Sequence, residues 1–224
     1  MSALAQLRAQ DGETVTGSDR LADRGALGET RKRLETAGIK LFAQDGSGVD
    51  ARTGRLVVST AIEADNADLL RAKKLSVPIV HRADELAEIA SSRRCVAVAG
   101  TSGKSTVTAM IFQLLETSGL SPSLACGANL PMLRRRGLIG NAWRGTSDLL
   151  VIEADESDGT LTRYSPWLGL LLNISKDHKE LSELKALFQT FRERSKTIIV
   201  NADAGLSEFE AGGLTFGFKA GAVR

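Results

Sequence analysis

The sequence has little aromatic content, little cysteine and almost no net charge. Aromatic side chains make up 4% of its 224 residues, so the core has to be built mainly from Leu, Val, Ile and Ala. The two cysteines, Cys95 and Cys126, form neither a disulfide framework nor a zinc-binding spacing. We therefore expect both thiols to be reduced and buried, as in a cytoplasmic protein.

Long apolar runs and a strong charge of one sign are also missing. No run approaches the roughly 20 apolar residues of a membrane span, and charged residues interrupt the first segment, which therefore does not read as a signal peptide. The formal net charge of +2 gives no reason to expect nucleic acid. The three arginines at 134–136 could touch a phosphate, but a charge run lies more often on a solvated loop. We expect neither a membrane nor a nucleic-acid partner.

The sequence alternates short apolar runs with stretches of helical spacing. Strands are expected at 14–17, 39–42, 56–59, 78–80, 96–99, 149–152, 168–172 and 197–200. Helices are expected at 2–10, 27–37, 66–74, 83–90, 104–117 and 181–191. This alternation predicts an α/β protein with parallel sheets. The segment SSRR at 91–94 is interpreted as a linker, which predicts two domains, residues 1–92 and 93–224.

A glycine-rich loop, GTSGKST, follows the apolar run that ends at residue 99. A Walker A loop would need its first glycine at position 98, which is Val98. A strand, a glycine loop, a lysine and two hydroxyls at a helix start nevertheless supply what phosphate binding requires. A plain capped helix, the alternative, leaves the lysine unexplained. We predict that phosphate binds at Gly100, Thr101, Ser102, Gly103, Lys104, Ser105 and Thr106, where the lysine neutralises β/γ charge and Ser105 offers its hydroxyl to Mg²⁺.

A second apolar run, in DLLVIEADESDGT at 148–160, ends in four carboxylates. α/β folds place ligand chemistry at the carboxyl ends of strands. Mg²⁺ takes oxygen ligands, usually one or two carboxylates together with phosphates, so Glu153 or Asp155 could hold it. A solvated acidic loop is an equally good explanation of this segment alone. Beside a phosphate loop, the metal hypothesis is favoured.

These segments resemble the motifs of the Mur ligases. AGTSGKST is similar to the AGTxGKT/ST loop of that family, which does not use the first Walker glycine. Two positions depart from the pattern of the alanine-adding branch: Ser102 stands where those proteins usually carry histidine, and Ser105 where they have threonine. Both changes keep the backbone cradle and a hydroxyl for the metal.

The resemblance also assigns roles downstream of the loop. EADESD is similar to a motif of the alanine-adding branch whose first glutamate binds Mg²⁺, which maps to Glu153. NISKDH resembles an element whose histidine is a metal ligand near the γ-phosphate, which maps to His178. A lone loop histidine is usually just exposed, but its place one strand after the acidic motif favours the metal role. The neighbouring candidates without assigned roles are Asp155, Glu156, Asp158, Asn173 and Asp177.

Three segments of the first half resemble, in order, further elements of the same family. VTGSDR, VVSTAIEADN and PIVHRADELAEI are similar to "VSGSD", "VVSSAI…DNPE" and "PVVRRAEMLAEL". The first of these helps to bind the UDP-sugar substrate in the family, and an acid at a strand end binds a ribose hydroxyl in nucleotide-binding folds. Ordinary polar chemistry at strand ends is the alternative. The implied UDP-sugar contacts are Ser18, Asp19, Ser59, Thr60, Ala61 and Arg82, with His81 as a weaker candidate.

The resemblance implies a cytoplasmic, ATP- and Mg²⁺-dependent ligase of peptidoglycan precursor synthesis. Such an enzyme joins an amino acid to UDP-N-acetylmuramate, and the alanine-adding branch would use L-alanine. The substrate carboxylate attacks the γ-phosphate, and the amine then displaces phosphate from the acyl phosphate. Lys104, Glu153 and His178 are the implied catalytic residues, and Ser105, Glu153 and His178 the implied metal ligands. A muramoyl-tripeptide substrate remains open, as does a nucleotide- or UDP-sugar-binding fragment without turnover.

The resemblance covers nearly all of this chain but only about half of a family member. In the family a first strand and a G-x-G-G-x-G loop precede the segment at residues 1–4, and a third domain follows the central one. We therefore expect a Rossmann-like N-terminal domain without its first strand, followed by an incomplete P-loop-type parallel α/β central ATPase domain. We expect residues 1–92 to be less stable than a complete Rossmann-like domain. The amino acid added and the oligomeric state remain open.

Overall fold

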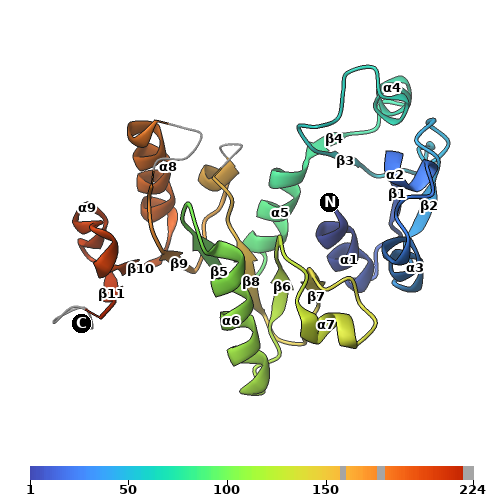
Figure 1. Cartoon of the computed structure of the whole chain (residues 1–224). Coiled ribbons are helices and arrows are strands. Elements are labelled where there is room, and N and C mark those ends of the chain that lie inside the picture. Colours follow the sequence, from blue (N-terminus) through green and yellow to red (C-terminus); the bar gives the residue numbers. More distant parts are fainter. Residues whose placement is uncertain (157–159, 176–179, 219–224) are drawn as a thin grey trace. The chain divides into compact units, whose positions relative to one another are not determined.

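A computed structural model of the chain describes residues 1–156, 160–175 and 180–218 (Figure 1). Strands and helices alternate along these ranges, and every strand pairing with a determined register is parallel. The predicted α/β class is therefore confirmed. No helix of the described residues is both long enough and apolar enough to cross a membrane.

The chain divides into two compact units. The first comprises Met1–Leu86 and Asn129–Arg144, and the second Ala87–Ala128 and Gly145–Arg224. This division differs from the predicted boundary after residue 92 in two ways. The break falls inside a helix, α5 (Arg82–Ser91), and only residues 92 and 93 of the predicted linker lie between α5 and the next strand, which begins at Arg94. Residues 129–144 also join the first unit, where Ile139 packs with Leu34 and Ile39.

The first unit contains two separate pairs of short parallel strands. β1 (Thr16–Ser18) pairs with β2 (Lys40–Phe42), and β3 (Leu56–Val58) pairs with β4 (Ile79–His81). Two helix starts are capped by side chains, since Asp19 accepts from the Leu21 N–H and Asn66 from the N–H groups of Asp68 and Leu69. The remaining elements of this unit are α1 (Ser2–Gln10), α2 (Arg20–Asp23), α3 (Glu29–Thr36), α4 (Ala67–Lys74), α7 (Pro131–Arg135) and the short strand β7 (Ala142–Trp143).

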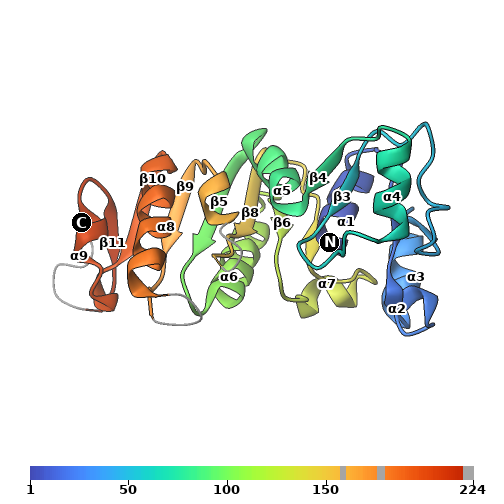
Figure 2. The same cartoon turned by 90° about the horizontal axis from the view of Figure 1, so that it is seen from above.

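The second unit is built on one continuous parallel sheet. Its strands follow one another in the order β11, β10, β9, β5, β8, β6, as Figure 2 shows. They are β5 (Arg94–Ala99), β6 (Ser123–Ala125), β8 (Leu149–Glu153), β9 (Leu168–Leu171), β10 (Thr197–Asn201) and β11 (Leu214–Phe216). The helical elements are α6 (Lys104–Thr117), α8 (Leu181–Arg194), α9 (Ser207–Glu210) and the 3₁₀ turns η1 (Thr160–Arg163) and η2 (Ala202–Ala204).

The two long helices of this unit cover opposite faces of the sheet. Val98 and Leu170 pack against residues of α6. A side chain at Gly169, the residue before Leu170 in β9, would point to the other face and meet Phe191 of α8 at about 3.0 Å. With both faces covered, the central strands are buried, as a parallel sheet requires. Val98, at the position of the first Walker glycine, is fully buried between Glu153 of β8 and Leu170 of β9.

Candidate nucleotide-binding site

The glycine loop connects the carboxyl end of β5 to the start of α6, as the sequence predicts. Gly103 precedes α6 with φ of +80°, and Gly100 has φ of +145°. A Cβ atom at Gly100 would lie 3.1 Å from Cβ of Leu172 and 3.2 Å from the backbone N and O of Asn173. Backbone conformation and close approach therefore both favour glycine here. The turn leaves the N–H groups of the first turn of α6 at the loop, where an anion binds favourably.

Asn173, just after β9, holds the loop in this conformation. Its Oδ1 accepts hydrogen bonds from Oγ1 of Thr101 and from the N–H of Ser102, both at 2.9 Å, and its Nδ2 donates to the Ser102 carbonyl at 3.0 Å. The Thr101 N–H donates to the Asn173 carbonyl at 3.1 Å. The sequence marked Asn173 only as a neighbour of the metal site. The structure shows that it holds the glycine loop in place.

Lys104 is held by two oxygen atoms. Its Nζ donates to the Gly100 carbonyl at 2.8 Å and to Oε2 of Glu156, also at 2.8 Å. The side chains of this ion pair are 12% and 7% exposed. Glu156 lies three residues beyond the end of β8, so the acidic segment does reach the phosphate loop, as predicted. The contact assigns Glu156 to the lysine, a role that the sequence did not specify.

Glu153 ends β8 and faces the first turn of α6. Its carboxylate accepts from Oγ of Ser105 at 2.8 and 2.9 Å and from the N–H of Gly127 at 2.7 Å. A Cβ at Gly127 would lie only 2.9 Å from Oε2 of Glu153, so glycine permits this approach. Gly127 was not foreseen, because neither its spacing nor its neighbours link it to residue 153 in the sequence.

Cys126 also contacts the Glu153 carboxylate. Its Sγ lies 3.5 Å from Oε2 of Glu153 and accepts from the N–H of Ala128 at 3.4 Å. Burial is the main cause that raises the pKa of the Cys126 thiol to about 11, and the nearby Glu153 carboxylate acts in the same direction. The thiol is therefore protonated near neutral pH and can donate to the carboxylate. Both cysteines are free and buried, as predicted.

The loop and Glu153 enclose a pocket of about 290 Å³, lined by Thr101, Gly103, Lys104, Ser105, Thr106 and Glu153. These are all predicted site residues. The Ser105 hydroxyl and the Glu153 carboxylate supply two oxygen donors side by side, which suits Mg²⁺. No group of three or more His, Cys, Asp and Glu side chains gathers as a metal site within the described residues. His178, Asp158 and Asp177 lie outside them.

The predicted UDP-sugar residues stand at the carboxyl ends of the first unit's strands. Ser18 ends β1, and Asp19 caps α2 with its Oδ1 2.7 Å from the Leu21 nitrogen. The carboxyl ends of β3 and β4 are adjacent, since Val58 pairs with His81. The residues that follow these two strands directly are Ser59, Thr60, Ala61 and Arg82. His81 accepts from the Ala83 N–H through Nδ1 at 3.2 Å.

Asp68 of α4 is a buried acid that the sequence analysis missed. It accepts a hydrogen bond from the Ser18 hydroxyl, and its Oδ1 accepts from the N–H of Gly46 at 2.8 Å. Asp68 therefore ties the end of β1 to the loop after β2 and to α4. The segment Asn-Ala-Asp at 66–68 contains the capping asparagine, but nothing in the local sequence indicates that Asp68 is buried.

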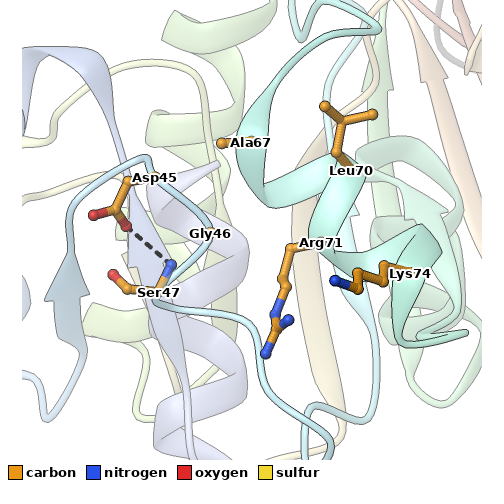
Figure 3. A pocket seen from close by; sticks show the side chains of 7 residues that line it. All are labelled: Asp45, Gly46, Ser47, Ala67, Leu70, Arg71 and Lys74. Atoms are coloured by element: carbon orange, nitrogen blue, oxygen red, sulfur yellow. Dashed lines mark hydrogen bonds between the residues drawn. The ribbon is translucent and has the colours of Figure 1, made fainter.

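A second pocket, of about 540 Å³, lies in the first unit (Figure 3). Figure 3 shows Asp45 and Ser47 on the loop after β2 and Leu70, Arg71 and Lys74 on α4. Its lining residues are Asp45, Gly46, Ser47, Ala67, Leu70, Arg71 and Lys74. None of the predicted UDP-sugar residues is among them. Hydrogen bonds of Asp68 link Gly46 in this pocket to Ser18.

Comparison with known proteins shows what this chain is similar to. The sequence model described as "Mur ligase family, catalytic domain" matches residues 1–94. UDP-N-acetylmuramate–L-alanine ligase of Streptomyces griseus is 40% identical over 210 residues, which cover 91% of this chain and 43% of that protein. Over nearly its whole length, the chain is therefore similar in sequence to part of a Mur ligase.

Solved structures show the same similarity. UDP-N-acetylmuramate-alanine ligase of Thermotoga maritima matches with a TM-score of 0.80 and 26% identity, over 98% of this chain and 50% of that one. UDP-N-acetylmuramate:L-alanyl-gamma-D-glutamyl-meso-diaminopimelate ligase of Neisseria meningitides shares the fold, with a TM-score of 0.76 and 21% identity over 97% and 73%. The chain thus spans less than half the length of the Streptomyces relative.

Proposed function

We propose that the second unit binds ATP with Mg²⁺ through residues 100–106. The observation that supports this most strongly is the pair of 2.8 and 2.9 Å contacts between the Ser105 hydroxyl and the Glu153 carboxylate, beside a pocket lined by the loop. A hydroxyl at the start of a helix and a carboxylate at the end of the neighbouring strand are the two oxygen donors that a phosphate-bound Mg²⁺ uses.

In this proposal each residue of the loop has a physical task. The N–H groups of the loop and of the first turn of α6 bind phosphate oxygens, and Lys104 supplies a positive charge. Asn173 keeps the loop in the conformation that presents those groups. The bound metal would neutralise negative charge on the phosphates. His178 is proposed as a further metal ligand on the strength of its motif alone.

We further propose that the protein joins L-alanine to UDP-N-acetylmuramate at the expense of ATP. The support is the name of the relative that is 40% identical over 91% of the chain. The substrate carboxylate attacks the γ-phosphate and releases ADP, and the amine of L-alanine then replaces phosphate to form the amide. Positioning and charge neutralisation are the contributions expected of the protein in such a phosphoryl transfer.

The first unit is proposed to bind the UDP-sugar at Ser18, Asp19, Ser59, Thr60, Ala61 and Arg82. Their common position at the carboxyl ends of parallel strands supports this assignment, because ligands of α/β folds bind there. Reduced cysteines and the use of ATP fit a cytoplasmic step of peptidoglycan synthesis.

Calorimetry of nucleotide binding tests the proposed ATP site. ADP in excess MgCl₂ is titrated into the wild-type chain, into Lys104→Ala, and into Lys185→Ala as a control. Lys185 lies on α8 and pairs with Glu208 on the surface. We expect Lys104→Ala to weaken binding by roughly 100-fold, because a buried charge partner of the phosphates is lost, and the control to bind like wild type. Equal affinity of wild type and Lys104→Ala would refute the assignment.

Turnover separates the ligase from a protein that only binds nucleotide or UDP-sugar. The chain is incubated with ATP, MgCl₂, UDP-N-acetylmuramate and L-alanine, and the products are identified by mass spectrometry. A ligase gives ADP and the alanyl derivative of the UDP-sugar. Binding of both ligands without either product would favour the binding function instead.

A further inference from the structure

We infer that Glu156 makes nucleotide binding at this site depend on the metal, because it neutralises Lys104 until a metal-complexed phosphate replaces it. The inference rests on the proposed ATP site and adds a specificity-determining residue to it. It concerns the choice between Mg²⁺-bound and metal-free nucleotide, which neither the motif nor the comparisons address.

Lys104 is already paired with a carboxylate. Its Nζ lies 2.8 Å from Oε2 of Glu156, and both side chains are nearly buried, at 12% and 7% exposure. Charges interact more strongly in such a place than on the surface, because the effective dielectric constant is lower. The phosphate-binding lysine is therefore already paired. A phosphate that is to use Lys104 has to compete with the carboxylate of Glu156.

The carboxylates of Glu153 and Glu156 accept from different kinds of donor. Glu153 is held by neutral donors: the Ser105 hydroxyl, the Gly127 N–H and the Cys126 thiol. Glu156 is held by the Lys104 cation. Among the described residues that make these contacts there are thus two negative charges and one positive charge. These three groups together carry one net negative charge before a ligand arrives, although the backbone of the loop is shaped for an anion.

These charges predict how the two forms of a nucleotide differ. A metal-free nucleotide brings only negative charge, has to take Lys104 from Glu156, and places its phosphates near two carboxylates. A magnesium nucleotide brings two positive charges to the Ser105–Glu153 side and leaves less repulsion when Lys104 changes partner. The loop amides favour both forms equally. Glu156 thereby penalises the metal-free form selectively.

Calorimetry with ADP, in excess MgCl₂ and separately in EDTA, tests this inference. For the wild type we expect binding in MgCl₂ to be at least about tenfold tighter than in EDTA. Glu156→Gln keeps the size of the side chain and removes its charge. We expect it to raise the affinity for metal-free ADP by roughly tenfold and to change the affinity for Mg-ADP much less.

Two further variants show whether the effect is specific to the charge of Glu156. Glu153→Gln should also reduce the difference between the two conditions, but by weakening Mg-ADP, since it removes a metal ligand. Glu193→Gln is the matched control: it makes the same change at an exposed residue in the last turn of α8, and should leave both affinities unchanged. If Glu156→Gln does not fold, as judged by its thermal melt, Glu156→Ala is measured in its place.

The possible outcomes separate this inference from the function on which it rests. If the wild type does not bind Mg-ADP, the proposed ATP site is wrong and the inference falls with it. If the wild type binds Mg-ADP but removal of the Glu156 charge leaves metal-free binding unchanged or weaker, Glu156 only positions Lys104, and the inference alone is overturned. A selective gain in metal-free binding supports both.

Discussion

Strands β1–β4 of the first unit and the central strands of the second unit are buried to very different degrees. In the second unit every residue of β5 after Arg94 is buried, and β5 lies between two long neighbours. In the first unit none of the residues in β1, β2, β3 and β4, all of which the structure describes, is buried. Parallel strands usually need cover on both faces, so the two units cannot be stabilised in the same way.

Polar contacts take over part of this task in the first unit. Glu85, with a side chain only 2% exposed, pairs with Arg8 and Arg55. Asp68 joins β1 to α4, and Asn141 bonds with Ser2 and Gln6 of α1. In the second unit, a buried apolar sheet supports the glycine loop. In the first unit, hydrogen bonds support the elements that carry the predicted substrate residues. We therefore expect amides of residues 1–92 to exchange with solvent faster than those of the β5, β8 and β9 strands.

The largest effect is expected from a core truncation in the second unit. Phe112 of α6 is fully buried, so Phe112→Ala should lower the free energy of unfolding of this unit by about 3–5 kcal/mol through lost burial and a cavity. Leu114→Ala is the control, since Leu114 lies on the same helix and is 65% exposed. Urea denaturation monitored by hydrogen exchange of peptides measures both. A loss no larger than that of the control would show that the sheet core does not dominate this unit.

A smaller but still clear effect is expected from a polar contact in the first unit. Asp68→Ala removes the acceptor of the Ser18 hydroxyl and of the Gly46 N–H, and we expect about 2–3 kcal/mol of lost stability. The exposed residue Asp65 gives the control, Asp65→Ala. In peptide-resolved exchange the loss should be confined to the first unit. Identical unfolding curves for the two variants would mean that hydrogen bonds do not take the place of the missing apolar cover.

The smallest effect concerns alkaline pH and the second unit, which contains both cysteines. Burial raises the pKa of Cys95 to about 12 and is the main cause that raises that of Cys126 to about 11. The raised values mean that the fold favours the neutral thiols, so their contribution is complete below the unfolded pKa of 9.0 and is lost as pH rises toward about 11. Cys126→Ala should flatten the fall in melting temperature between these pH values. An unchanged slope would contradict the linkage.

The contrast between the units also explains what the sequence could predict. Buried runs such as 95–99 and 149–152 are strong signals, and the loop, Lys104, Ser105 and Glu153 follow from them. The helix caps Asp19 and Asn66 are local signals as well. Short or weakly apolar elements were missed, among them β6, β11, α2, α7 and α9.

The contacts that complete the sites could not be predicted, because they join residues far apart in the chain. Asn173 contacts the phosphate loop, Gly127 contacts Glu153, and Asp68 contacts Ser18. Each depends on which strand ends the fold brings together. The predicted linker at 91–94 rests on composition alone, and in the structure α5 continues through Ser91 and β5 begins at Arg94.

A crystal structure of the chain with MgCl₂ and a non-hydrolysable ATP analogue would test directly whether the glycine loop binds nucleotide and whether Lys104 then leaves Glu156. We expect phosphate density against the N–H groups of residues 101–106 and a metal ion that contacts Ser105 and Glu153. It also predicts that Nζ of Lys104 has left Glu156 for a phosphate oxygen. Nucleotide bound away from this loop, or a phosphate-filled loop in which Lys104 still contacts Glu156, would contradict it.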